Sequence, residues 1–217
     1  MPDHAPTVPG PVGGRAKRAT DLALAVPLAV ATAPVMAAIA VWVRRDSPGP
    51  ALYRQRRVGY AGAPFTLLKF RTMVVGAERM GAGLAVRDGD DRITRVGRLL
   101  RRLSLDELPQ LWNVIRGDMS LVGPRPTVAS QVELYDARQR RRLLARPGLT
   151  GLAQVSGRNA IPWSERIEMD VAYVDAWTPR RDLAILARTA RVVLGRGGTY
   201  ASERGGFDLS RPGAPDG

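Results

Sequence analysis

The sequence predicts an α+β fold in which a small, mostly helical domain with a short β-hairpin follows an N-terminal apolar helix. Three patterns predict it: an uncharged run at residues 22–43, two strand-like segments at 51–58 and 65–73, and helical periodicity further along the chain. The later helices are expected at residues 92–102, 165–177 and 182–194. With 217 residues, of which 45% are hydrophobic, the chain is long enough for one domain and a membrane segment.

The composition excludes several kinds of chemistry. The chain has no Cys, so it can form no disulfide and offers neither a thiolate nor a Cys-based metal site. Its only His, His4, lies in a segment rich in Pro and Gly, which argues against histidine acid–base catalysis and His-clustered zinc. Any catalytic acid, base or nucleophile must therefore come from Asp, Glu, Ser, Thr, Tyr or Lys.

The formal net charge of +13 indicates a polyanionic partner. Nucleic acid, anionic lipid headgroups and phosphorylated substrates all fit such a surplus, and charge alone does not choose among them.

The chain divides into four predicted regions. Residues 1–14 and 198–217 offer little to bury, so they are expected to be a disordered N-terminal tail and a flexible C-terminal tail. Residues 15–46 form a membrane-anchoring segment, and residues 47–197 form the globular domain.

The apolar run at 22–43 predicts a membrane helix. As a helix it would be ~33 Å long, enough to cross a bilayer core of about 30 Å. Pro27 and Pro34 interrupt its hydrogen bonding, and basic residues flank both of its ends, which favours keeping both ends in the cytoplasm. These features favour a re-entrant helix that breaks near Pro34 and returns to the same face. A straight span explains only the length, and a buried core helix is a third reading.

Two short patterns place cations where they could hold phosphate. Lys69 and Arg71 are two residues apart, so on a strand they share a face and could clamp phosphate oxygens, or they could simply face solvent. Arg125 lies between Pro124 and Pro126, whose fixed φ angles stiffen its backbone. A rigid Arg suits bidentate phosphate recognition, although a surface turn would look the same.

The adjacent carboxylates Asp106 and Glu107 are the candidate reactive groups. Ser104 and Glu107 fit a capping box, so Glu107 could simply cap a helix, and Pro109 would then move the helix start further along. Asp106 lies at or just before a helix N-terminus, where an ionised carboxylate is favoured. Beside a bound phosphate it could serve as a nucleophile or a magnesium ligand, but adjacent carboxylates are also common on surfaces.

Taken together, these motifs resemble those of the bacterial sugar transferases, the monotopic phosphoglycosyl transferases that begin glycan assembly on undecaprenyl phosphate. The resemblance extends from about Lys17 to Gly197 and rests on several long motifs in the right order. These motifs are residues 69–73 (KFRTM), 104–111 (SLDELPQL), 117–126 (GDMSLVGPRP), 146–151 (RPGLTG), 154–159 (QVSGRN) and 170–174 (DVAYV).

The resemblance implies a covalent mechanism in residues 47–197, the catalytic domain. Asp106 and Glu107 match the family's catalytic pair: Asp106 attacks the β-phosphate of a UDP-sugar, UMP leaves, and undecaprenyl phosphate takes the phosphosugar from the Asp. Magnesium is the expected cofactor, with Asp106 as its protein ligand, and Glu107 positions the metal or handles a proton. The resemblance also implies that the substrate phosphates are bound by five basic residues: Lys69, Arg71, Arg101, Arg125 and Arg158.

The resemblance also implies a location and partners. A re-entrant helix that breaks at a Ser-Pro pair would anchor the enzyme in one leaflet of the bacterial inner membrane, with the catalytic domain on the cytoplasmic face. Here the pair is Ala33-Pro34, so the hydroxyl is missing. Membrane lipids are expected partners and nucleic acid is not, and a homodimer is compatible with the sequence.

The motifs leave some properties open. They do not identify the sugar, give no role to Asp170, and do not decide whether the product is exopolysaccharide, capsule, O-antigen or a glycoprotein glycan. The alternative function is a membrane-tethered basic binding or scaffold protein without catalysis, which would not depend on Asp106.

Overall fold

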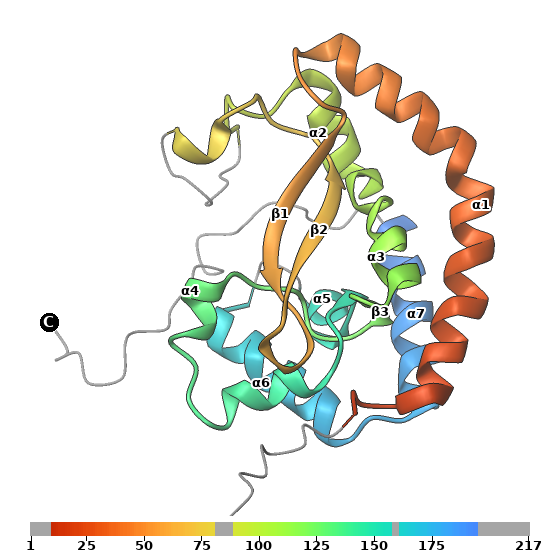
Figure 1. Cartoon of the computed structure of the whole chain (residues 1–217), viewed down its shortest axis with the longest axis vertical. Coiled ribbons are helices and arrows are strands. Elements are labelled where there is room, and N and C mark those ends of the chain that lie inside the picture. Colours follow the sequence, from red (N-terminus) through yellow and green to blue (C-terminus); the bar gives the residue numbers. More distant parts are fainter. Residues whose placement is uncertain (1–9, 81–88, 158–160, 195–217) are drawn as a thin grey trace, which may run out of the picture.

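The computed structural model describes residues 10–80, 89–157 and 161–194, and these form the predicted α+β fold (Figure 1). Helices dominate, and an antiparallel hairpin lies among them. Residues 1–9 of the predicted N-terminal tail, the whole predicted C-terminal tail and Arg158 lie outside the described residues.

Helix α1, Gly14–Asp46, contains the predicted apolar run and continues beyond it at both ends. Its 33 residues correspond to about 50 Å of helix, and the helix continues through both Pro27 and Pro34. In Figure 1 the helix curves along one side of the molecule. Among the described residues it is the one helix long and apolar enough to cross a membrane.

The N-terminal end of α1 is bound to the globular domain by buried polar contacts. Lys17 forms an ion pair of 2.6 Å with Asp182 of the last helix, and both residues are buried. One turn later, the buried carboxylate of Asp21 accepts hydrogen bonds of 3.0 Å from the Ser120 hydroxyl and from the Leu121 backbone amide. These contacts bridge about 100 residues or more of sequence, so they fix the helix to the domain rather than to its own neighbours.

The C-terminal end of α1 is bound to the same domain. Asp46 accepts a hydrogen bond of 2.9 Å from the backbone amide of Val96 in the next α-helix. Arg71 donates to the Ser47 hydroxyl at 2.5 Å, to the Ser47 carbonyl at 2.8 Å and to the Pro50 carbonyl at 2.7 Å. Between these two bound ends, large apolar side chains of α1 are exposed: Leu24, Val26, Leu28, Val30, Val35, Val41 and Trp42.

The predicted hairpin is confirmed. Strands β1, Leu52–Val58, and β2, Pro64–Phe70, pair antiparallel through a short 3₁₀ turn, η1, Tyr60–Gly62. Asn113, on helix α3, holds β2 from the side: its Oδ1 accepts from the Leu68 amide at 3.0 Å, and its Nδ2 donates to the Thr66 carbonyl at 2.7 Å. The second strand ends three residues earlier than Met73, which instead forms an isolated bridge with Ile93.

The remaining elements surround this hairpin. Strands β3 and β4 form a second, parallel pair that the sequence patterns did not predict. The elements are η2 (Ala77–Arg79), α2 (Arg95–Arg102), η3 (Leu105–Glu107), α3 (Gln110–Arg116), β3 (Ser120–Val122), α4 (Ala129–Val132), η4 (Gln139–Leu144), β4 (Gly148–Thr150), α5 (Leu152–Ser156), α6 (Trp163–Asp175) and α7 (Pro179–Leu194).

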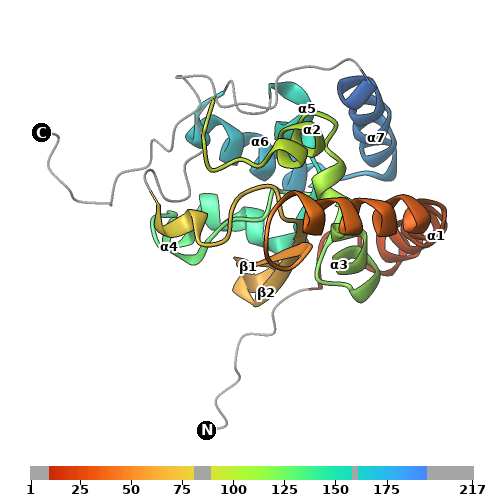
Figure 2. The same cartoon turned by 90° about the horizontal axis from the view of Figure 1, so that it is seen from above.

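Three clusters of buried apolar side chains hold these elements together. The largest joins the N-terminal half of α1 to β2, α3, β3, α6 and α7, and the second joins its C-terminal half to β2 and α2. The third cluster, formed by Val58, Val132, Tyr135, Ile167 and Val171, contains no residue of α1. Figure 2 shows α1 and α6 on different sides of the hairpin. The hairpin is thus fixed to α1 at one end and to α6 at the other.

Candidate active site

Asp106 and Glu107 lie together on η3, between α2 and α3. Ser104, just before this turn, has a left-handed φ of 56°, which is uncommon for a residue with a side chain and turns the chain sharply after α2. Its hydroxyl caps nothing, so the capping-box reading is wrong; α3 begins only at Gln110, with Pro109 before it. Pro109 therefore forfeits no helical hydrogen bond, and both carboxylates are left for other contacts.

Glu107 is held by two cations from different parts of the fold. Its Oε1 is 2.8 Å from the Lys69 ammonium on β2 and 3.4 Å from the Arg125 guanidinium in the loop after β3. Burial opposes ionisation of Glu107, but the charges of Lys69 and Arg125 outweigh it and lower its pKa to about 2. Glu107 is therefore ionised at physiological pH and connects the hairpin to the Pro124–Pro126 loop.

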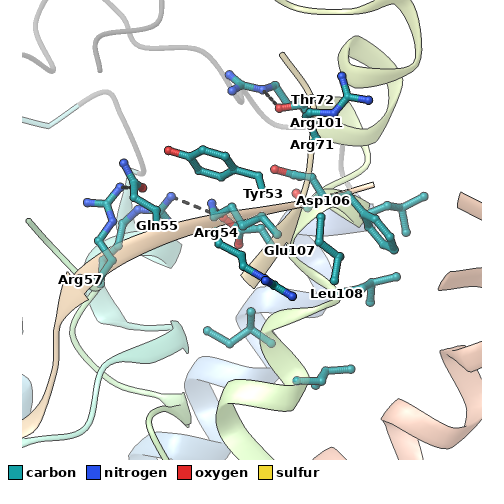
Figure 3. Close-up of a pocket in the computed structure, with 18 of the residues that line it drawn as sticks. Tyr53, Arg54, Gln55, Arg57, Arg71, Thr72, Arg101, Asp106, Glu107 and Leu108 are labelled. Carbon is teal, nitrogen blue, oxygen red and sulfur yellow. Dashed lines mark hydrogen bonds and ion pairs between the residues drawn. The ribbon is translucent and has the colours of Figure 1, made fainter. Parts of the chain in front are cut away.

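Asp106 has a different environment from its neighbour. Its half-buried carboxylate has no hydrogen bond or ion pair with any residue in the described part of the chain, and it faces the cleft shown in Figure 3. Burial raises the pKa of Asp106 to about 6; the nearby charge of Glu107 adds to this, while Lys69, Arg101 and Arg125 oppose it. A carboxylate in this setting is ionised near neutral pH, poorly solvated and free to react.

The cleft around Asp106 is large, and most of the charged side chains that line it are cations. It has a volume of about 1940 Å³, and ten of its described lining residues are Arg or Lys against four that are acidic. The cations are Arg44, Arg54, Arg57, Lys69, Arg71, Arg79, Arg101, Arg125, Arg142 and Arg166. Its size accommodates a nucleotide-sized ligand, and the excess positive charge suits one that carries phosphates.

The structure brings three of the predicted phosphate-binding residues to this cleft beside the two carboxylates. Lys69 and Arg125 contact Glu107, and the Nε of Arg101 donates to the Thr72 hydroxyl at 2.8 Å, which fixes its guanidinium near Asp106. Arg71 also lines the cleft, but it is only 5% exposed, and its donors serve the chain's own Ser47, Pro50 and Val43 oxygens. Its contacts in the structure are those of a brace between α1 and β2.

A buried ion pair behind the site was not predicted. The guanidinium of Arg142, on η4, contacts Asp170 on α6 at 2.6 Å, and both side chains are 2% exposed. Arg142 also donates to the Tyr135 hydroxyl at 2.6 Å and to the Arg125 carbonyl at 2.9 Å. Asp170 thus supports the backbone of Arg125 through Arg142. The two members are 28 residues apart, and no spacing in the sequence pairs them.

Two glycines of the 117–126 and 146–151 motifs allow backbone segments to pack closely. A Cβ on Gly123 would lie 2.3 Å from the Arg146 carbonyl oxygen, and one on Gly151 would lie 2.1 Å from the Gly123 carbonyl oxygen. This close approach lets β3 and β4 pair and places the Pro124–Pro126 loop at the cleft.

The carboxylates of the cleft could hold a metal ion that needs few protein ligands, such as magnesium. No cluster of three or more His, Cys, Asp or Glu that could hold a metal occurs within the described residues. Magnesium, however, is commonly held by one or two carboxylates together with substrate phosphates and water. The unengaged carboxylate of Asp106 at the cleft fits that role, with Glu107 next to it but committed to Lys69.

Comparison with known proteins gives a consistent result over most of the chain. The model of the family described as bacterial sugar transferase matches residues 12–196. A UDP-glucose:undecaprenyl-phosphate glucose-1-phosphate transferase of Caulobacter vibrioides is 46% identical over 192 residues, which cover 85% of this chain and 72% of that protein. The exopolysaccharide production protein ExoY of Sinorhizobium fredii is 40% identical over 205 residues, covering 88% of this chain and 90% of the relative.

A longer relative shows the same similarity over part of its length. The undecaprenyl-phosphate galactose phosphotransferase of Salmonella typhimurium is 43% identical over 198 residues; the match covers 85% of this chain but 41% of that protein. The similarity to all three relatives covers more than four fifths of this chain.

Proposed function

The chain belongs to the bacterial sugar transferase family, and from this we propose that it transfers a sugar-1-phosphate from a UDP-sugar to undecaprenyl phosphate, releasing UMP. The product would begin the assembly of a glycan such as an exopolysaccharide. The observation that carries the proposal is the unengaged, half-buried carboxylate of Asp106 in a cleft where ten cations outnumber four acidic residues. A basic binding or scaffold protein needs no such reactive group, so this alternative is not favoured.

The proposed chemistry has two displacements at one phosphorus. In the first, an oxygen of Asp106 forms a bond to the β-phosphorus of the UDP-sugar, the bond to the bridging oxygen breaks, and UMP leaves with that electron pair. In the second, an oxygen of the lipid phosphate attacks the same phosphorus, and the Asp106 carboxylate leaves. The products are UMP and a sugar diphosphate lipid, and the enzyme returns to its starting state.

The cations around Asp106 supply the electrostatic part of the proposal. Lys69 and Arg125 hold Glu107 ionised and stationary, while Arg101 and the exposed part of Arg125 are available to phosphate oxygens. Fixed charges that meet a developing negative charge lower a phosphoryl-transfer barrier without reorganisation. Magnesium, held by Asp106 and the diphosphate, would neutralise further charge on the leaving nucleotide.

The direct test is UMP release from a panel of UDP-sugars by the full chain with magnesium and undecaprenyl phosphate. We expect turnover of one sugar or a few, dependent on the lipid phosphate, which would also identify the donor. If a folded protein released no UMP from any sugar in the panel, the transferase proposal would be refuted in favour of the scaffold alternative.

The proposed nucleophile sets a measurable pH dependence. Only the ionised form of Asp106 attacks, and burial raises its pKa to about 6. We therefore expect kcat/KM for the UDP-sugar to fall about tenfold per pH unit below that pKa and to level off above it. Removing a neighbouring negative charge by Glu107→Gln should move the midpoint down, and removing a positive charge by Lys69→Met should move it up. A profile that is flat between about pH 5 and about pH 8 would contradict this assignment.

We also propose that α1 anchors the protein in one leaflet, with both ends on the cytoplasmic face. Its N-terminal turn is bound to β3 and α7 through Asp21 and Lys17, and its C-terminal turn is bound to α2 through Asp46. A straight span would separate these ends by a bilayer, yet both contact the same globular domain. The exposed apolar residues between them, Val30 the most exposed at 70%, would then enter the lipid.

Cysteine labelling tests this placement, because the chain has no native Cys. In inverted membrane vesicles, single Cys residues introduced as Val12→Cys and Pro50→Cys should both react with an impermeant thiol reagent. In right-side-out vesicles, neither should react until the membrane is opened. Labelling of the two positions from opposite faces would refute re-entry and support a straight span.

A further inference from the structure

One face of β1 carries a row of polar side chains that the proposed mechanism does not use. Tyr53, Gln55 and Arg57 alternate along the strand, so they share the face that lines the cleft (Figure 3). The Tyr53 hydroxyl donates to a carboxylate oxygen of Glu78 on η2, and the Gln55 amide donates to the same oxygen at 2.9 Å. These contacts orient Gln55 so that its own carbonyl oxygen accepts from the Arg57 guanidinium.

Arg57 is a partly buried cation that forms no ion pair with a described residue, although the nearby charge of Glu78 favours its charged form. Its Nε is buried with no hydrogen-bond acceptor within the described part of the chain. Glu78, the acid on this side of the cleft, is engaged by Tyr53 and Gln55. Burial, and then the charge of Arg125, lower the pKa of Arg57 to about 10. A desolvated cation beside a second cation is unfavourable until an anion binds between them.

Arg125 is that second cation, and it is also open to a ligand. Pro124 and Pro126 restrict its backbone, and Arg142 holds its carbonyl oxygen at 2.9 Å. Its guanidinium makes one long contact of 3.4 Å with Glu107, and its side chain is 44% exposed. Two planar guanidiniums that share few internal acceptors match the oxygens of a phosphate group.

We propose that Arg57 and Arg125 form a second phosphate subsite, which holds the nucleotide part of the donor and, after transfer, the leaving nucleoside monophosphate. This proposal rests on the proposed function. When the bond to the β-phosphorus breaks, the departing monophosphate gains negative charge, and fixed guanidiniums at that oxygen would stabilise it.

The position of Arg57 favours the soluble donor over the lipid acceptor as the occupant. Val58, its neighbour, packs in the third core cluster, which contains no α1 residue, whereas Leu52 at the other end of β1 packs against the second cluster, to which α1 contributes Ile39 and Val43. Arg57 is five residues along the strand from Leu52, or about 17 Å. The subsite thus lies at the end of β1 that is attached to α6 rather than to the membrane helix.

Direct binding of UMP to the full chain in detergent, measured by titration calorimetry, tests the subsite without turnover. We expect Arg57→Gln to weaken UMP binding at least about tenfold, as the loss of charge-assisted hydrogen bonds to phosphate would. The matched control is Arg56→Gln, which removes the same charge from the adjacent exposed residue on the other face of β1, outside the cleft. It should change UMP affinity by less than about twofold.

Steady-state kinetics then show whether the subsite binds a phosphate of the UDP-sugar or the phosphate of the lipid acceptor. In Arg57→Gln we expect the KM for the UDP-sugar to rise and the KM for undecaprenyl phosphate to stay unchanged. A rise in the acceptor KM alone would assign the subsite to the lipid and overturn the proposal. So would unchanged UMP binding in Arg57→Gln, an equal loss in Arg56→Gln, or no UMP binding by the wild type at millimolar concentration.

Two further readouts keep the test decisive. If Arg57→Gln does not fold, Arg57→Lys keeps the charge but loses the planar fork, and it should still weaken UMP binding measurably. If the wild type binds UMP through Arg57 yet turns over no UDP-sugar, the transferase proposal fails while the nucleotide subsite stands. If the wild type turns over a UDP-sugar but UMP affinity does not change in Arg57→Gln, only the proposal of the subsite is refuted.

Discussion

Asp106→Asn is expected to lower UMP release by at least about 10³-fold, because the amide keeps the shape of the side chain and removes the nucleophile. In the structure, the Asp106 carboxylate has no hydrogen bond to maintain within the described residues, so the substitution leaves no broken contact behind it. The measurement is UMP release from the UDP-sugar that the wild type uses. Intact-mass analysis without the lipid acceptor should show a phosphosugar adduct on the wild type and none on the variant.

The matched control is Asp175→Asn, the same change at a surface acid of α6 that pairs with Arg141. It should alter turnover by less than about twofold, since exposed ion pairs contribute little. Full turnover in Asp106→Asn would remove Asp106 as the nucleophile. Lost turnover with a retained adduct would instead place the covalent bond elsewhere and leave Asp106 the role of a metal ligand.

The sequence predicts elements whose local patterns are strong. The hairpin follows from two strand-like runs around a Gly- and Pro-containing turn, and the later helices follow from their apolar periodicity, with ends that differ by a few residues. Helix α2 begins at Arg95 rather than at residue 92 because the Thr94 hydroxyl accepts the Gly97 amide at 3.0 Å and caps the helix there.

The sequence predicts much less about contacts between distant residues. Lys69 and Arg71 look equivalent on one strand, yet Lys69 contacts Glu107 while Arg71 is buried against the end of α1. The difference depends on where α1 ends in space, which no local pattern encodes. The sequence also did not predict that one face of β1 lines the cleft. The 51–58 run predicts a strand, but only the tertiary structure shows that Arg57 lines the same cleft as Arg125, near enough for the two charges to interact.

Asp170→Asn is expected to destabilise the fold by about 3–5 kcal/mol, the range typical when one member of a buried ion pair is removed. Arg142 is 2% exposed, and its guanidinium lies 5.5 Å from the ring centre of Tyr135 and 5.6 Å from that of Trp163. Without the Asp170 charge, this cation stays buried and uncompensated. Thermal or denaturant unfolding of the full chain in detergent, compared with the wild type, measures the loss.

The control for Asp170 lies two residues away on the same helix. Glu168 pairs with Arg138 at 2.7 Å, but both side chains are largely exposed, so Glu168→Gln should cost less than about 1 kcal/mol. Equal effects from the two substitutions would show that burial does not decide the cost. Asp170→Asn should also lower turnover in the molecules that remain folded, because Arg142 then holds the Arg125 carbonyl less firmly. The carboxylate that the motif left without a role would therefore act on both stability and turnover through one guanidinium.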